Sequence, residues 1–178
     1  MNLVACSGAA LCKFLCVALA GVPSAGFNAD DAVRKQILDA GGLAMVFSAL
    51  RTHRSNDAVQ LGGIAMLACL GHGDDSTKDA IIAQEGISAI LAAMKENPGS
   101  FRVMVGACAA ISTIAAGTSS SSIESKKVIF ESGSMSQVLR VMQIYSQPKV
   151  HAECAGAIAN VVAGDSGAHQ SNAQLLLL

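Results

Sequence analysis

Apolar residues recur along this chain at the spacing of an α-helix, and short polar or glycine-containing segments separate them. Ala155, Ile158 and Val161, for example, return every third residue, which places them on one face of a helix. Segments such as 95–100 contain Pro and Gly, which interrupt helices. The pattern therefore predicts a succession of short helices joined by tight connections.

The same pattern returns with a regular period. Apolar residues of a short helix recur 44, 47 and 47 residues apart, at Ile37, Ile81, Val128 and Leu175. A glycine follows this helix in three units, at Gly42, Gly86 and Gly133. Self-similarity at such a period is the signature of a stacked repeat protein. We expect these glycines to adopt the left-handed backbone conformation that ends one helix and begins the next.

A longer helix closes each unit, and its apolar residues fall in three columns. The columns are Leu11, Ile64, Cys108 and Ala155; Phe14, Leu67, Ile111 and Ile158; and Val17, Leu70, Ile114 and Val161. Because each column lies three residues from the next, the three columns form one apolar stripe that must face a neighbouring helix.

Each unit is predicted to contain a short first helix, a glycine turn, a middle helix and a long third helix. Complete units span 30–72, 76–117 and 124–164, whereas 1–21 matches only a third helix and 169–178 only the start of a first helix. All of them belong to one solenoid domain.

Two irregularities accompany the period. The serine run 119–122 adds length between the second and third units, and it is predicted to be a solvated loop. In the third unit, Met135 and Val138 fit the apolar columns only after a shift of one residue. We interpret this shift as a local insertion that leaves the repeat intact.

The composition favours an all-α protein that binds neither nucleic acid nor a membrane. Hydrophobic residues make up 52% of the 178 residues, but the chain has only 5 Phe, 1 Tyr and no Trp, whereas strands are enriched in aromatic residues. The formal charge of -1 provides no basic field to attract phosphates. The longest uncharged stretch, 103–123, is apolar only as far as Ala116, so it is shorter than the roughly 20 residues of a membrane span.

The cysteines are predicted to be reduced thiols. All 6 lie in apolar helical segments, where Cys behaves as a small hydrophobic residue. Cys12 and Cys16 share a helix face, but no His lies in that segment to complete a zinc site. The apolar segment 3–21 could imitate a signal peptide, yet no basic residue precedes it and Lys13 interrupts it. We therefore predict a cytoplasmic or nuclear protein without a metal or a cofactor.

Two short motifs resemble those of enzymes. The segment 164–167 reads Gly-Asp-Ser-Gly, as around the nucleophile of trypsin-like proteases, but that chemistry needs a His base and an Asp assembled on β-barrels. The segment 151–154 contains the His-x-Glu of zinc deaminases without a following Pro-Cys-x-x-Cys. No phosphate-binding glycine loop is present either. The sequence therefore predicts no catalytic residues and a protein that is not an enzyme.

With three helices in each unit, a Gly-Gly or Glu-Gly turn and an Ala-rich third helix, the chain resembles the armadillo repeat. The likeness is carried by segments 35–43, 81–87 and 154–163. It implies a right-handed α-solenoid whose third helices line a concave groove for extended peptides or partner proteins. HEAT repeats, with two helices per unit, are the nearest alternative. Because both ends fall within a repeat, we also expect a piece of a longer array that self-associates through its uncapped ends.

The resemblance also suggests which residues line the groove. In peptide-binding armadillo proteins a third-helix Asn clamps the peptide backbone, and a Trp lies one turn earlier. The Asn column of this chain reads Cys16, Cys69, Thr113 and Asn160, and the Trp column reads Cys12, Ala65, Ala109 and Gly156. The groove is therefore expected to carry small, nearly neutral side chains, with charges at its edges from Arg102, Lys149 and Glu153. Helix packing alone would also explain the Ala and Cys positions.

Together these observations predict a protein–protein interaction scaffold that binds a partner protein or peptide along the concave groove. One alternative keeps the fold and changes the role, to a regulatory armadillo segment of a larger multidomain enzyme such as a kinase of the leucine-rich-repeat type. An importin-like nuclear-transport receptor is a weaker alternative, because Asn160 alone matches the clamp pattern and no Trp is present.

Overall fold

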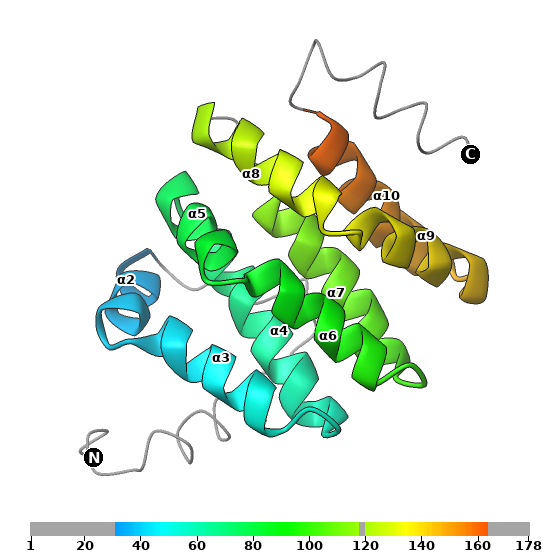
Figure 1. The fold of residues 1–178 in the computed structure, drawn as a ribbon, viewed down its shortest axis with the longest axis horizontal. Coiled ribbons are helices and arrows are strands. Elements are labelled where there is room, and N and C mark those ends of the chain that lie inside the picture. The colour runs from blue at the N-terminus through cyan, green and yellow to red at the C-terminus, as the bar shows by residue number, and fades with distance from the viewer. Residues whose placement is uncertain (1–30, 118–119, 164–178) are drawn as a thin grey trace.

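The computed structural model describes residues 31–117 and 120–163, and these residues form nine helices and no strand (Figure 1). The helices follow one another in three sets of three: α2 (Asp31–Asp39), α3 (Gly42–Thr52) and α4 (Asp57–Gly71); α5 (Asp75–Ala83), α6 (Gly86–Glu96) and α7 (Phe101–Ile114); α8 (Ser120–Glu131), α9 (Ser134–Ile144) and α10 (Pro148–Val162). The helices predicted at 1–21 and 169–178 lie outside the described residues.

Corresponding helices of successive sets lie side by side. The third helices α4, α7 and α10 form one layer, and the second helices α3, α6 and α9 form another (Figure 1). The first helices α5 and α8 contact each other along one side of the stack. Each set has three helices rather than two, as in an armadillo repeat and unlike a HEAT repeat. The chain is an all-α solenoid in which neighbouring sets pack in chain order.

The turn between the first and second helices contains a left-handed residue, one position earlier than predicted in two sets. The positive φ angles are 75° at Gly41, 62° at Glu85 and 79° at Gly133. The prediction was therefore wrong for Gly42 and Gly86, which are the first residues of α3 and α6. In these two sets the packing leaves no room for a side chain there: a Cβ on Gly86 would lie 2.6 Å from the backbone oxygen of Ile81, and Gly42 has the same contact with Ile37.

The third set confirms the shift of one residue. Ile129 is fully buried and takes the place of Ile37 and Ile81, whereas Val128 is 43% exposed. Ser134 stands where the other sets have Gly42 and Gly86, and its hydroxyl donates a hydrogen bond to the backbone oxygen of Ile129 at 2.6 Å. The loop predicted for the serine run is wrong from residue 120 onward, because α8 begins there.

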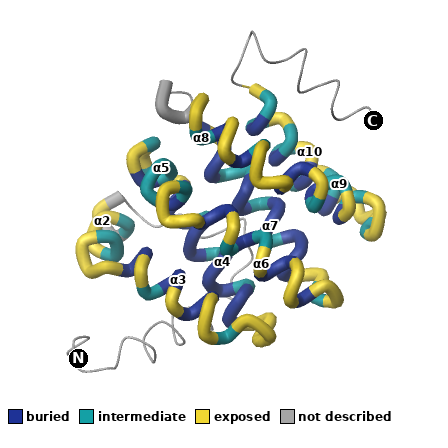
Figure 2. The backbone as a smooth tube through the Cα atoms, in the orientation of Figure 1, coloured by how far each residue is buried: buried dark blue, intermediate teal, exposed yellow. Residues whose placement is uncertain are grey.

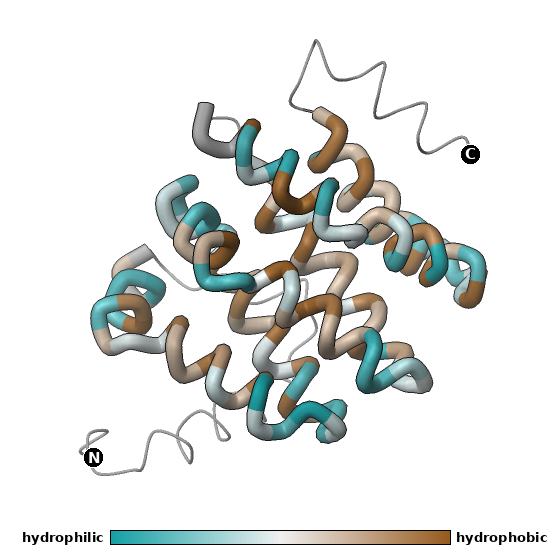
Figure 3. The backbone as a smooth tube through the Cα atoms, viewed as in Figure 1, coloured by the Kyte–Doolittle hydropathy of each residue, from teal (hydrophilic) through white to brown (hydrophobic). Residues whose placement is uncertain are grey.

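One continuous apolar core extends from α3 to α10 and is centred on α4 and α7 (Figure 2). The predicted stripe is buried on both of these helices, at Ile64, Leu67, Leu70, Cys108, Ile111 and Ile114. On α10, Val161 is buried, Ile158 is half-buried and Ala155 is exposed. Hydropathy follows the same division, with hydrophilic residues in the connections at the ends of the helices (Figure 3).

Two polar side chains connect a third helix to the end of the second helix before it. The amide of Gln60 is 1% exposed, and its Nε2 donates to the backbone oxygens of Leu50 at 3.0 Å and His53 at 2.8 Å. His151 occupies the same place in the third set, where its Nε2 lies 2.9 Å from the Tyr145 oxygen. In each case a side chain on the third helix satisfies carbonyls that the end of the second helix leaves unpaired.

Side chains also satisfy several helix ends. Asp74 caps α5, and hydrogen bonds from the Thr77 hydroxyl, the Thr77 backbone and the Ser76 hydroxyl lower the pKa of its carboxyl group. Lys126 of α8 is 7% exposed and donates to the backbone oxygen of Ala163, just after α10, at 2.7 Å. Burial lowers the pKa of Lys126, and this hydrogen bond places its ammonium at the negative end of a helix.

Candidate partner-binding surface

The third helices approach one another closely because small residues lie between them. A Cβ on Gly106 would lie 3.0 Å from Cδ1 of Leu61, and one on Gly156 would lie 3.1 Å from Oγ of Ser112. The third helices consequently contact each other far more extensively than the second helices do. The third helices α4, α7 and α10 therefore form the more tightly packed face of the stack.

Two neighbouring helices of this face carry most of the predicted groove residues. They are Arg102, Ala109 and Thr113 on α7, and Lys149, Glu153, Gly156 and Asn160 on α10. Arg102 and Lys149 are exposed, and the other five are half-buried. Each residue of α7 corresponds to a residue 47 positions later on α10. The repeat therefore places equivalent positions side by side. We call these seven residues the third-helix surface.

Two predicted groove residues do not join the third-helix surface. Cys69 is 2% exposed on α4, so a partner cannot reach its thiol, and its assignment to the groove was wrong. The equivalent positions Thr113 and Asn160 are half-buried, so the burial of Cys69 was not visible in the sequence columns. Cys16 lies outside the described residues.

The polar groups at the clamp positions already have partners within the chain. Nδ2 of Asn160 donates to the backbone oxygen of Ser112 at 2.9 Å and to its hydroxyl at 3.2 Å, which ties α10 to α7. The Thr113 hydroxyl donates to the backbone oxygen of Ala109 at 3.0 Å. In this arrangement the Asn160 amide hydrogens point to α7, so a partner would have to displace Ser112 to be clamped by them.

An aromatic pair adjoins the third-helix surface, and it was not predicted from the sequence. Phe101 at the start of α7 meets Tyr145 at the end of α9 edge to face, with ring centroids 5.2 Å apart and an angle of 77°. Phe101 is 41% exposed and the neighbouring Ile144 is 57% exposed. A signal was present in the sequence, since large apolar residues at helix ends have little chance of burial. Phe101, Ile144 and Tyr145 form, together with Arg102, a partly apolar edge of the kind found in protein interfaces.

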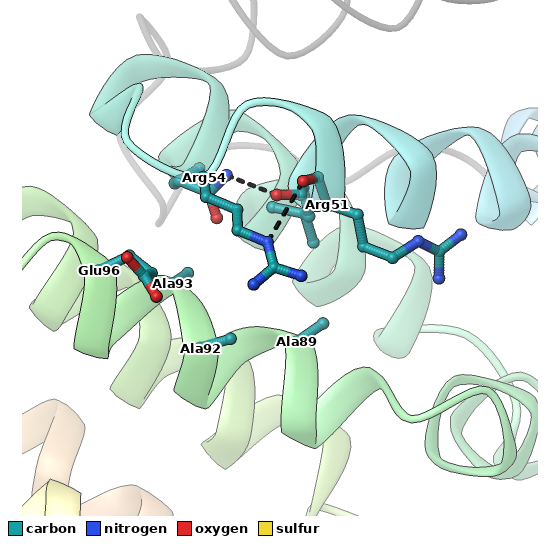
Figure 4. A pocket seen from close by; sticks show the side chains of 8 residues that line it. Arg51, Arg54, Ala89, Ala92, Ala93 and Glu96 are labelled. Atoms are coloured by element: carbon teal, nitrogen blue, oxygen red, sulfur yellow. Dashed lines mark hydrogen bonds between the residues drawn. The ribbon is translucent and has the colours of Figure 1, made fainter.

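A small cleft lies on the opposite side, between α3 and α6 (Figure 4). Ala89, Ala92 and Ala93 line it on the α6 side, and Arg54 lies between the two helices, where its Nε donates to the Arg51 backbone oxygen at 3.4 Å. Glu96 is the only acid among the residues that line it. The lining supplies neither a thiol nor an imidazole. The cleft is therefore lined mainly by alanine side chains and two guanidinium groups.

No metal centre or membrane span emerges from the described part of the chain. No three His, Cys, Asp or Glu side chains gather there in a way that could hold a metal ion. No helix among the described residues is long and apolar enough to cross a membrane. His151 of the deaminase-like motif faces backbone oxygens, and the protease-like segment 164–167 lies outside the described residues.

Comparison with known proteins identifies the architecture. No family model and no curated protein matches the sequence. Among solved structures, an engineered protein superposes with a TM-score of 0.72 over 92% of this chain and 61% of its own, at 23% identity. A designed armadillo repeat protein in complex with the peptide (KR)4 superposes with a TM-score of 0.69 over 90% of this chain and 62% of its own, at 18% identity. A second designed armadillo repeat protein gives 0.69 over 91% and 68%, at 21% identity.

This chain has the armadillo-repeat fold. Similarity at such low identity establishes the architecture, and the chain spans about three fifths of the length of the first two structures. In this fold α4, α7 and α10 are the third helices of three consecutive armadillo repeats. The third-helix surface lies on the second and third of these helices.

Proposed function

We propose that this protein is a non-enzymatic interaction module that binds a partner protein or peptide on its third-helix surface. The observation that carries the proposal is the side-by-side placement of equivalent positions on α7 and α10: Arg102 with Lys149, Ala109 with Gly156 and Thr113 with Asn160. A surface that repeats its chemistry along an axis suits a ligand that is extended along the same axis. The designed armadillo protein that was solved with (KR)4 supports a peptide as one form of that ligand.

The chemistry of the surface favours a partner that packs closely and carries little positive charge. Ala109 presents only a methyl group, so a partner can approach the backbone of α7 there. Arg102 and Lys149 are exposed at one edge and would repel a basic peptide. The clamp amide of Asn160 is bonded to Ser112. These features disfavour an importin-like receptor for basic peptides.

The test is to obstruct the surface with one bulky charge. In Ala109→Arg the new side chain projects from the half-buried centre of α7, whereas in the control Ala92→Arg it projects from an exposed position on α6, in the other layer. Both variants add the same group to a helical alanine. Proteins captured from a cell extract by each variant and by the unchanged chain are quantified by mass spectrometry, and each candidate is then titrated in purified form.

We expect the true partner to bind Ala92→Arg normally and to lose at least about tenfold in affinity, or 1.4 kcal/mol, with Ala109→Arg. Equal binding to both folded variants would remove the third-helix surface as the binding site. Labelled (KR)4 is the probe for the importin-like alternative, and its fluorescence anisotropy should not saturate at micromolar protein. Saturation there would favour a receptor for basic peptides instead.

A further inference from the structure

Two cysteines on neighbouring third helices touch each other in the core. Cys108 of α7 and Cys154 of α10 belong to the second and third repeats, and their sulfur atoms are 3.3 Å apart, within a thiol–thiol hydrogen bond. Both residues are fully buried. We infer that Cys108 and Cys154 are a redox-active pair, which a peroxide oxidises to a disulfide bond that joins the second and third repeats.

The surrounding packing allows the disulfide to form without large movement. The bond requires a sulfur–sulfur distance of about 2.05 Å, so the two atoms must approach by about 1.2 Å from the observed 3.3 Å. The two helices are already held close, because Gly156 faces Ser112 and the Asn160 amide bridges to the same residue. Small side-chain rotations within this tight interface can supply the remaining approach.

Packing alone does not require two sulfur atoms at this place. The equivalent positions between α4 and α7 are Ile64 and Ala107, which are also fully buried. Between α4 and α7, one large and one small side chain therefore fill this space. Between α7 and α10, two cysteines fill the equivalent space. Cys69, the third buried cysteine of the described residues, corresponds in the repeat to Thr113 and Asn160, so it serves as an internal control.

The hydrogen bond between the sulfur atoms couples the ionisation of the two thiols, because the thiol that keeps its proton can stabilise the thiolate of the other. Either sulfur can therefore start the reaction, and both orders lead to the same disulfide; the order that begins at Cys154 is as follows. The Cys154 thiolate attacks hydrogen peroxide, so that a sulfur–oxygen bond forms, the oxygen–oxygen bond breaks and a sulfenic acid remains. The hydroxide that leaves takes up the thiol proton and becomes water.

The second step closes the bond. The Cys108 sulfur attacks the Cys154 sulfur, the sulfur–oxygen bond breaks, and the leaving hydroxide takes the Cys108 proton and departs as water. In total the two thiols lose two hydrogen atoms and one peroxide is reduced to two waters. Because both sulfurs are buried, the first step requires a local separation of α10 from α7 and will be slower than the oxidation of exposed thiols.

The test is a map of the cysteines after oxidation of the whole chain. Trypsin cuts after Arg102, Lys126 and Lys149, so Cys108 lies in peptide 103–126, Cys154 in peptide 150–178 and every other cysteine elsewhere. The folded protein is treated with hydrogen peroxide, unfolded, alkylated and digested. We expect these two peptides to be joined, to separate with dithiothreitol, and to carry no alkyl group on either cysteine before reduction.

The urea-unfolded chain, given the same peroxide, controls for the dose. The inference is wrong if that chain is oxidised while Cys108 and Cys154 of the folded chain remain free thiols and are alkylated. It is also wrong if the folded chain joins them mainly to other cysteines. This map uses the unchanged chain, so it tests the inference even if the cysteine variants fold poorly.

Thermal unfolding provides a second readout. Oxidation should raise the midpoint by about 10 °C in the unchanged chain, because a disulfide of native geometry restricts the unfolded state. Cys69→Ser should retain that increase, and Cys154→Ser and Cys108→Ala should each lose it. An unchanged midpoint in a chain that is fully cross-linked would contradict the claim that the bond fits the native helix spacing.

Discussion

The two interfaces between third helices are both extensive but differ in chemistry. Between α4 and α7 the close contacts are apolar: Gly106 faces Leu61 and Ile64, and Gly71 faces Ile114. Between α7 and α10 they are polar or contain sulfur: Gly156 faces the Ser112 hydroxyl, Asn160 donates to Ser112, and Cys154 meets Cys108.

This difference shows that the repeat specifies the geometry of an interface and leaves its chemistry open. Apolar contacts contribute in proportion to the area they remove from water, and they carry little directional information. Hydrogen bonds contribute less in net terms but fix one relative position of the two helices. We therefore expect the first interface to contribute more to stability and the second to control the register of α10 against α7.

The largest expected effect is at the place that Ile64 and Cys108 share in the repeat. Ile64→Ala removes a fully buried side chain next to Gly106 and should lower the free energy of unfolding by about 3 kcal/mol. Cys108→Ala, the matched change in the second interface, removes only a sulfur atom and should cost about 1 kcal/mol. Urea unfolding of both variants under reducing conditions measures the difference, and equal losses would mean that the two interfaces are energetically alike.

A smaller effect is expected where the second interface is polar. Asn160→Ala removes two hydrogen bonds to Ser112 and should cost about 1 kcal/mol. Thr113→Ala is the matched control, because this hydroxyl bonds within its own helix and should cost less than about 0.5 kcal/mol. Amide hydrogen exchange of α10 should rise in Asn160→Ala alone. The same exchange in both variants would contradict a role for Asn160 in holding α10.

The smallest effect concerns the starts of the two outer third helices. Asn56 caps α4 by accepting a hydrogen bond from the Val59 backbone at 3.2 Å, whereas Gln147 at the start of α10 makes no such bond. Gln147 has the extended backbone of a cap residue, with φ at -70° and ψ at 135°. Gln147→Asp should therefore stabilise the protein by about 0.5 kcal/mol, and Asn56→Ala should destabilise it by about 0.5 kcal/mol, the low end of the range for a cap, because its bond is long. A thermal midpoint that falls in Gln147→Asp would show that α10 starts in another way.

Periodicity predicted the architecture because each unit repeats the same apolar face. The buried positions Ile64, Leu67 and Leu70 could be identified from spacing alone, and the one-residue shift at Met135 was visible in the apolar columns. The left-handed residues were missed by one position at Gly42 and Gly86. At Gly42 the preceding residue is also a glycine, so the sequence does not show which of the two is left-handed, whereas before Gly86 the left-handed residue is Glu85. Only the contact of Gly42 and Gly86 with a preceding carbonyl shows why these two positions lack a side chain.

The candidate site was predicted less well than the fold. Spacing placed Arg102 and Lys149 at corresponding positions, but it could not show that Cys69 is buried or that the Asn160 amide is bonded to Ser112. The bonds of Gln60 and the Phe101–Tyr145 pair were not anticipated either, because their partners lie on other helices.

The sequence by itself determined that this chain folds into stacked three-helix units, because burial of an apolar stripe depends on residues a few positions apart and repeats with the period. Only the tertiary structure decided which groups meet across the repeats, including Cys108 with Cys154 and Asn160 with Ser112. Those contacts join residues 46 and 48 positions apart, and their distances depend on how closely the backbones approach. That approach is set by glycines and by the whole packed stack, so no local pattern records it.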